Sequence, residues 1–138
     1  MIGVLIITHG NLGYELIKAT EMIKGVDTRG IIPISLDAKT GVEDIKKEIT
    51  SAIKRADLGE GVLIMTDLFG GTPSNISLSF LKEEKVEVVT GVNLPMMLKI
   101  SDIREEKKKL VEFANLVKVY GRKNIYLASE ILNRKAGD

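Results

Sequence analysis

Short apolar runs alternate with longer amphipathic segments along the whole chain. The runs are rich in branched residues, a composition typical of strands that are buried on both faces of a parallel sheet. We expect strands at residues 1–8, 31–36, 61–66 and 86–90. Pro33 lacks the N–H donor that a central strand needs, so the second strand is predicted to lie near an edge of the sheet.

The segments between the first three runs have helical periodicity and clear ends. Asn11 is the expected N-cap of the first helix and Gly25 its C-cap. The apolar face of this helix is predicted to consist of Leu12, Leu16, Ala19 and Ile23. Residues 40–43, Thr-Gly-Val-Glu, have the pattern of a capping box and predict a second helix.

Two further helices are predicted around the fourth run. Thr72 is the expected N-cap of the first of them, Pro73 fits its first helical position, and the helix is expected to reach about Lys82. A short helix is expected to begin at Pro95 and to end near Ile100.

The C-terminal part predicts a helix, a strand and a tail. Asp102 is the expected cap of a longer helix that ends at Gly121, with residues 105–109 on its solvated side. Residues 124–128 predict a short final strand, and residues 133–138 a frayed tail.

The alternation of strands and helices predicts an α/β fold, with a doubly wound, mostly parallel sheet and helices on both faces. We expect one domain over residues 1–138. The net charge of +1 favours no nucleic-acid partner, and the absence of cysteine together with a single histidine excludes the usual metal sites of one chain. No cofactor is expected. The first run is too short to span a membrane and has no basic leader, so a cytoplasmic location is expected.

The only histidine, His9, stands where the first strand ends. Ligands of open parallel sheets bind beyond the carboxyl ends of the strands, and Asp67 ends the third strand in the same way. If these strands are neighbours, a spacing of about 4.8 Å brings Asp67 within reach of His9. A carboxylate that accepts from one ring nitrogen leaves the other with its lone pair, as a positioned nucleophile.

The segment after Asp67 has the character of an anion site. Gly70, Gly71 and Thr72 lead into a helix N-terminus, where backbone N–H groups lack partners. The predicted phosphate-binding residues are Thr8, Gly10, Gly70, Gly71 and Thr72. A histidine nucleophile beside such a site suggests phosphoryl transfer through phosphohistidine. From the residues alone a hydrogen-bonded structural histidine stays open, and the glycine segment alone is equally a plain helix entry.

Three segments together resemble the EIIA component of the mannose/fructose/sorbose family of the bacterial phosphoenolpyruvate-dependent sugar phosphotransferase system. The segments are residues 7–10 (Ile-Thr-His-Gly), 66–75 (Thr-Asp-Leu-Phe-Gly-Gly-Thr-Pro-Ser-Asn) and 90–96 (Thr-Gly-Val-Asn-Leu-Pro-Met). Their order and spacing match over nearly the whole chain, to about residue 128. The resemblance implies that His9 is phosphorylated, that Asp67 orients it, and that Thr72 is the hydroxyl residue of the glycine segment.

The resemblance also implies partners and an assembly. HPr would donate the phosphoryl group and a separate EIIB would accept it, serving the EIIC and EIID membrane components indirectly. The implied strand order is 2-1-3-4, and the implied assembly is a homodimer in which residues 124–128 add antiparallel to the partner's sheet. We expect the protein partners to contact an apolar surface that includes Leu12, Phe69, Asn93 and Leu94.

Other functions are compatible with the same residues. A related domain serves as the phosphocarrier subunit of dihydroxyacetone kinase with the same histidine chemistry. A flavodoxin-like module would bind a ligand in the same crevice without covalent chemistry, although three Phe, three Tyr and no Trp weigh against a flavin. A regulator that keeps the histidine as a sensor is a third alternative. Neither the sugar nor the acceptor protein is encoded in these motifs.

Overall fold

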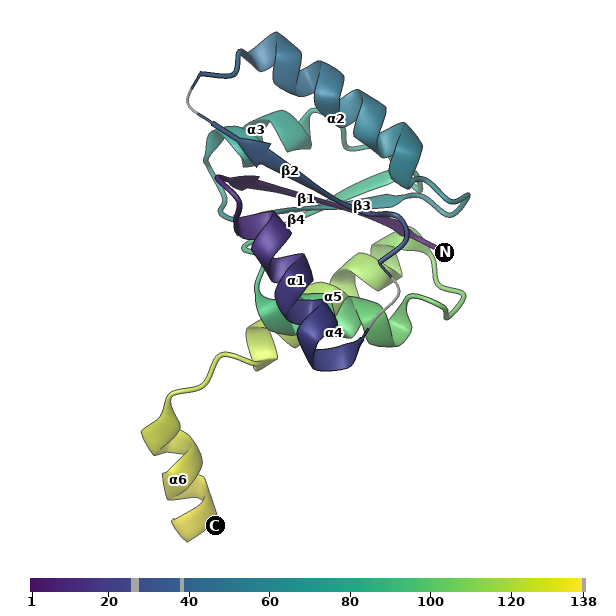
Figure 1. The fold of residues 1–138 in the computed structure, drawn as a ribbon. Helices are drawn as coiled ribbons and strands as arrows, with labels where there is room; N and C mark the ends of the chain where they lie inside the picture. The colour runs from purple at the N-terminus through teal and green to yellow at the C-terminus, as the bar shows by residue number, and fades with distance from the viewer. Residues whose placement is uncertain (26–27, 38, 138) are drawn as a thin grey trace.

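The structure is a computed structural model and describes residues 1–25, 28–37 and 39–137. Strands and helices alternate over most of its length (Figure 1). The strands are β1 (Gly3–His9), β2 (Ile31–Leu36), β3 (Val62–Thr66) and β4 (Val86–Thr90). The helices are α1 (Leu12–Lys24), α2 (Val42–Ala56), α3 (Thr72–Leu78), α4 (Leu94–Ile103), α5 (Leu110–Lys123) and α6 (Ala128–Gly137).

The four strands form a parallel sheet in the order β2-β1-β3-β4, which confirms the predicted fold class and strand order. The chain crosses from β1 to β2 on one side and then returns to β3 on the other. The direction of winding therefore reverses between β1 and β3, the place where such sheets bind ligands. β2 lies at an edge, as Pro33 predicts.

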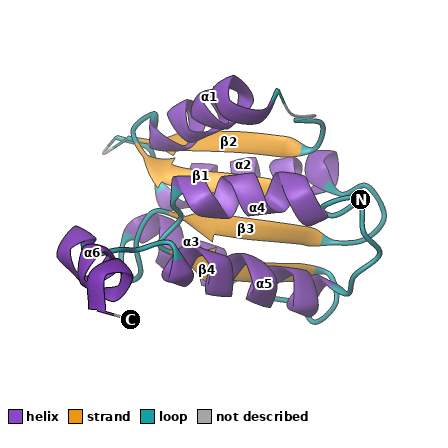
Figure 2. Cartoon of the chain, turned by 90° about the horizontal axis from the view of Figure 1, so that it is seen from below, coloured by secondary structure: helices purple, strands orange, loops and turns teal. Residues whose placement is uncertain are grey.

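Helices cover both faces of the sheet (Figure 2). Val4 and Ile6 of β1 pack with α1, α4 and α5, whereas Leu5 and Ile7 pack with α2 and α3. All four side chains are fully buried, because successive residues of a strand point to opposite faces. Burial of each contributes about 2 kcal/mol before entropy is subtracted, so β1 anchors both cores.

The face of α1 that packs on the sheet differs from the predicted one. It consists of Gly13, Ile17 and Thr20. Leu12 and Ile23, which the apolar pattern places inside, are exposed. A Cβ on Gly13 would lie 2.9 Å from Ile6 Cγ2, so α1 approaches β1 at a residue that has no side chain. A small residue carries no hydrophobic signal, so the prediction was wrong for Leu12 and Ile23, whereas Leu16 does pack against the core.

The capping box predicted for α2 does not form. Gly41 occupies the N-cap and makes no side-chain cap hydrogen bond. The Thr40 hydroxyl instead donates to Asp37 Oδ1 over 3.0 Å, within the turn that precedes the helix. The helix thus begins one residue later than the pattern requires, and the Thr40 side chain is held in the preceding turn by its bond to Asp37.

Helix α3 is shorter than predicted and starts one residue earlier. Gly71 is its N-cap, and Thr72 is already helical. The helix ends at Leu78, not near Lys82, because the next N–H groups bond to carbonyls three residues back. Such bonds tighten the last turn and stop the helix.

The long helix predicted from Asp102 is divided in two. Asp102 lies inside α4, which extends to Ile103, and its carboxylate pairs with Lys24 of α1. Residues 104–109 link the helices, and α5 begins at Leu110. Ile103 and Leu110 are both buried. Their spacing of seven fits a continuous helix equally well, so the apolar pattern did not reveal the break.

The strand predicted at residues 124–128 is not formed in the single chain. Residues 125–127 have no regular structure, and Ala128 begins α6, which replaces the predicted frayed tail up to Gly137. Figures 1 and 2 show α6 standing away from the sheet. The chain alone offers this segment no strand partner. Across the described residues, no helix has the length and apolar character needed to cross a membrane.

Candidate active site

His9 and Asp67 meet at the carboxyl edge of the two central strands. β1 ends at His9, Asp67 directly follows β3, and the pairing of Ile7 with Thr66 brings the two ends together. His9 Nδ1 lies 2.9 Å from Asp67 Oδ2, and the His9 backbone N–H donates to the same oxygen over 2.9 Å. The carboxylate therefore holds the histidine at both its ring and its backbone.

The Asp67 carboxyl is ionised at neutral pH. Partial burial acts to raise its pKa, but the hydrogen bonds from the His9 backbone and ring outweigh burial and hold the pKa below its ordinary value of 3.8. An ionised carboxylate only accepts hydrogen bonds, so the proton of a neutral His9 ring lies on Nδ1 and the lone pair on Nε2. The His9 side chain is 56% exposed, whereas that of Asp67 is 10% exposed.

The contact between Asp67 and His9 makes the free energy of unfolding depend on pH in the acidic range. The pKa of Asp67 is lower in the folded than in the unfolded state. The stabilisation that its carboxylate gives to the folded state is therefore complete above about pH 3.8 and is lost as pH falls through the folded pKa. We expect wild type to exceed Asp67→Asn by about 1 kcal/mol in unfolding free energy at pH 6, since the amide keeps an acceptor but loses the charge. Urea titrations should show this gap closing below pH 3.8, and a gap that stays constant down to pH 2.5 would contradict the assignment.

A cleft of about 390 Å³ opens beside His9. Its walls come from the end of β1, the segment between β2 and α2, and the start of α3. The lining residues are His9, Leu36, Asp37, Thr40, Val42, Ile45, Thr72 and Pro73. Asp37, Thr40 and Val42 were not predicted as site residues. The signal that was available is the strand pairing, because Leu36 lies opposite His9 and the residues after it share the same edge.

The glycines of the segment after Asp67 allow a close approach to the histidine. A Cβ on Gly71 would lie 3.2 Å from His9 Cε1 and 3.0 Å from Leu68 Cδ1. Gly70 has a φ of 89°, in the region that favours glycine, and open space surrounds the place of its Cβ. Thr72 lines the cleft. The structure thus brings three of the predicted phosphate-binding residues to the His9 side of the sheet.

Thr8 and Gly10, at the end of β1, each form a hydrogen bond to a neighbouring element. Thr8 is fully buried, and its hydroxyl accepts the Gly13 N–H over 3.0 Å, a bond that the side chain of Asn11 does not make. The Gly10 N–H donates to the Leu36 carbonyl over 3.1 Å. The Thr8 hydroxyl and the Gly10 N–H therefore have partners within the fold, whereas Thr72 lines the cleft.

The four predicted partner-binding residues fall into two pairs. Leu12 is 47% exposed and Phe69 is 74% exposed. Asn93 instead caps α4 by accepting the Met96 N–H over 3.0 Å, and its amide donates to the Gly121 carbonyl. Leu94 is partly buried against the core. Leu12 and Phe69 are thus the two of these residues with exposed side chains. Asn93 and Leu94 contact the rest of the protein at the start of α4.

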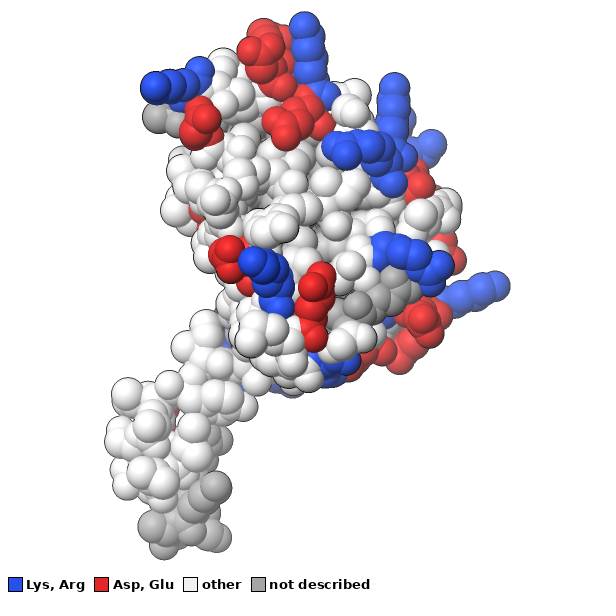
Figure 3. Space-filling view, in the orientation of Figure 1, with Lys and Arg blue, Asp and Glu red and all other residues white. Residues whose placement is uncertain are grey.

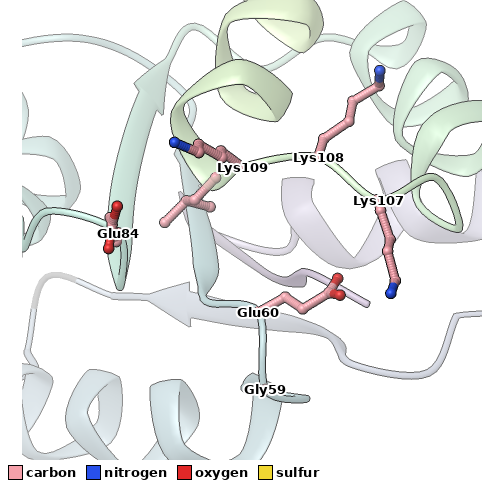
Figure 4. A pocket seen from close by; sticks show the side chains of 7 residues that line it. Gly59, Glu60, Glu84, Lys107, Lys108 and Lys109 are labelled. Atoms are coloured by element: carbon pink, nitrogen blue, oxygen red, sulfur yellow. The ribbon is translucent and has the colours of Figure 1, made fainter.

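A second hollow, of about 510 Å³, lies at the opposite edge of the sheet (Figure 4). It is lined by Gly59, Glu60, Glu84, Lys107, Lys108, Lys109 and Leu110. Glu60 pairs with the N-terminal amine over 3.0 Å, and Lys108 pairs with Glu106 over 3.2 Å. Two of the charges that line the hollow are therefore paired, and the lining holds no nucleophile paired with a base. In the described part of the chain, no three His, Cys, Asp or Glu residues gather as metal ligands.

Fold and site together define a class: a doubly wound α/β protein whose histidine is held by a carboxylate at the reversal point of the sheet. The family described as "PTS system fructose IIA component" matches residues 3–118. The fructose-specific EIIA component of Bacillus subtilis (strain 168) is 30% identical over 135 residues, 97% of this chain and 91% of the relative. The sorbose-specific EIIA component of Lacticaseibacillus casei is 34% identical over 99 residues, 71% and 70% of the two chains.

A solved structure agrees in fold. EIIA of the phosphotransferase system from Streptococcus agalactiae superposes with a TM-score of 0.83 at 24% identity, over 94% of this chain and 99% of that one. The chain belongs to the mannose/fructose/sorbose family of EIIA components of the phosphotransferase system, and it is a phosphocarrier of sugar uptake.

Proposed function

We propose that His9 accepts a phosphoryl group on Nε2 from phosphorylated HPr and passes it to an EIIB protein. One observation carries this assignment: Asp67 Oδ2 lies 2.9 Å from Nδ1 and leaves Nε2 as the nitrogen with a free lone pair. The 56% exposure of the His9 side chain leaves room for a protein donor. HPr and EIIB follow from membership of the family.

The transfer balances without an added acid or base. The Nε2 lone pair of His9 attacks phosphorus, and the N–P bond of the donor breaks with its electron pair returning to the donor ring. Nδ1 keeps its proton, so the phosphorylated ring is a cation that the Asp67 carboxylate stabilises over 2.9 Å. In the second transfer a nucleophile of EIIB attacks phosphorus, and the Nε2–P bond breaks with its electron pair returning to Nε2 of His9. The chain contributes position and charge rather than proton transfer.

The phosphoryl oxygens are proposed to face the start of α3. Thr72 lines the cleft with His9 and offers a hydroxyl donor, and Gly71 lies against the ring. The absence of a Cβ at Gly70 and Gly71 lets backbone N–H groups come near the oxygens. Thr8 and Gly10 are assigned a supporting role here, because their polar groups already have partners within the fold.

The donor and acceptor proteins are proposed to share one apolar surface beside His9. Phe69 stands at its centre, exposed over 74% of its side chain, with Leu12 on the neighbouring helix start. Exposed aromatic and aliphatic side chains of this kind are typical of the centre of a protein interface. A single surface forces donor and acceptor to bind in turn, which suits a carrier.

The direct test is intact-mass spectrometry of the protein mixed with Enzyme I, HPr and phosphoenolpyruvate. The proposal predicts a gain of one phosphoryl mass that is lost on brief acid treatment, since the N–P bond is acid-labile. No gain with an active HPr from a matching source would remove the transfer role. The cleft would then be a site for a small ligand, as in the flavodoxin-like alternative.

The assembly is proposed to be a homodimer joined by the segment after α5. Ile125, Tyr126 and Leu127 are exposed by 75%, 59% and 62% in the single chain. β4 is the last strand of the sheet, and beyond Val86, which bridges Lys82, its outer edge pairs with no other described strand. A hollow of about 200 Å³ between β4 and α5 lies along it. A partner's strand would satisfy this edge and cover the three side chains. Light scattering should give twice the chain mass for wild type and one chain mass for Ile125→Asp, and a monomeric wild type would contradict the proposal.

A further inference from the structure

We propose that Asp37 sets how strongly His9 holds its phosphoryl group. In this view the Asp37 carboxylate places a negative charge on the wall of the cleft, weakens phospho-His9 and keeps the group ready for transfer. This inference rests on the proposed function of His9. It concerns the equilibrium of the transfer, not the identity of the nucleophile.

The position of Asp37 follows from strand pairing. Leu36, the last residue of β2, lies opposite His9, and its carbonyl accepts the Gly10 N–H over 3.1 Å. Asp37 is the next residue and lines the same cleft as His9 and Thr72. A phosphoryl group on Nε2 therefore shares this cleft with a carboxylate from the neighbouring strand.

Asp37 is ionised under working conditions. The Lys39 backbone N–H donates to its Oδ1 over 2.8 Å and the Thr40 hydroxyl donates over 3.0 Å. These bonds, that from Lys39 above all, lower the pKa of Asp37 from 3.8. Both bonds end on Oδ1 and hold the carboxylate beside the cleft.

The two groups that bond to the Asp37 carboxylate, a backbone N–H and a hydroxyl, are neutral and leave its charge in place. In Figure 3 charged side chains gather over α2 and on the side of the amino-terminal strand ends. The left-hand part of that view is where the strands end in Figure 1. It has one basic and one acidic side chain near its top, and the surface below them is largely uncharged. Asp67 is the other acid of the site, and the ring of His9 pairs with it.

The expected size of the effect comes from Coulomb's law. A phosphoryl dianion and a carboxylate roughly 8 Å apart in water repel enough to change an equilibrium constant about five-fold at low ionic strength. At 0.15 M salt the Debye length of about 8 Å reduces the change to about two-fold. Removing the Asp37 charge should therefore shift the transfer equilibrium toward phospho-His9, and added salt should make this shift smaller.

The matched pair of variants is Asp37→Asn and Asp57→Asn. Asparagine keeps an oxygen that accepts the bonds from Lys39 and Thr40, so the turn is preserved while the charge is lost. Asp57 makes the same kind of bond, to the Gly59 N–H over 2.8 Å, but lies at the far edge of the sheet before β3. It controls for the change in net charge.

The measurement is the equilibrium constant for phosphoryl transfer from phospho-HPr, read from intact masses of both proteins at 10 mM and 300 mM salt. Asp37→Asn should raise the constant about five-fold at low salt and little at high salt, whereas Asp57→Asn should leave it unchanged. An unchanged or lowered constant for Asp37→Asn, beside a wild type that is phosphorylated, would overturn the inference alone. A wild type that takes up no group would overturn the proposed function instead.

Discussion

A His9→Gln variant is expected to take up no phosphoryl group from HPr, a complete loss against the stoichiometric gain of wild type. Glutamine keeps a polar side chain at the end of β1 but has no nitrogen with an available lone pair. The backbone N–H of residue 9 still donates to Asp67, so the fold should persist. Intact-mass spectrometry measures the uptake, and circular dichroism confirms the fold.

The matched control for this variant is Asp67→Asn, which retains the nucleophile. It should still accept the group, but with a rate lowered by about 100-fold or more, because an amide can turn its NH2 group toward Nδ1, which favours the wrong tautomer, and has no charge to stabilise the cation. Full phosphorylation of His9→Gln would place the acceptor on another residue. A normal rate in Asp67→Asn would show that the 2.9 Å contact has no part in transfer.

A Gly3→Ala variant is expected to be severely destabilised. A Cβ at Gly3 would lie 2.1 Å from the Ala56 carbonyl oxygen and 2.6 Å from its carbon, both backbone atoms at the end of α2. The strand cannot yield, because the Gly3 N–H bonds to the Gly61 carbonyl over 2.9 Å and β1 is central. We expect a loss of about 3 kcal/mol, a decrease of roughly 10 °C in Tm.

Gly41→Ala is the control for Gly3→Ala. Gly41 has a φ of −70°, and a Cβ at this position would come no nearer than 4.0 Å to Asp44 Oδ2. Its unfolding free energy should stay within about 0.5 kcal/mol of wild type. Thermal unfolding measures both variants. A Gly3→Ala protein as stable as Gly41→Ala would mean that β1 and α2 are not in close contact at this point.

The central strands and the contact between His9 and Asp67 were predictable from the residues themselves. A continuous run of branched apolar residues, such as the one that contains Ile6 and Ile7, is typical of a strand buried on both faces of a parallel sheet. His9 and Asp67 directly follow such runs, so the position of each in the sheet follows from the strand that it ends. Chemistry that depends on strand ends is therefore visible in a sequence of this class.

The rest depended on contacts that a linear pattern does not record. Gly13 brings α1 onto β1, yet a glycine contributes nothing to an apolar face. Asn93, whose predicted partner contact stays a prediction, also joins α4 to Gly121 through its amide, a contact across 28 positions. Asp37 enters the cleft only through the pairing of β2 with β1. In each case the packing of elements that are distant in the sequence, not the local composition, decides what the residue contacts.

The nitrogen that carries the phosphoryl group is the most direct test of the account. Phosphorus–nitrogen NMR of the phosphorylated, ¹⁵N-labelled protein should show coupling to Nε2 of His9, with the Nδ1 proton retained in its hydrogen bond to Asp67. Coupling to Nδ1 would contradict the account, because that nitrogen lies 2.9 Å from Asp67 Oδ2 and a phosphoryl group there would displace the carboxylate.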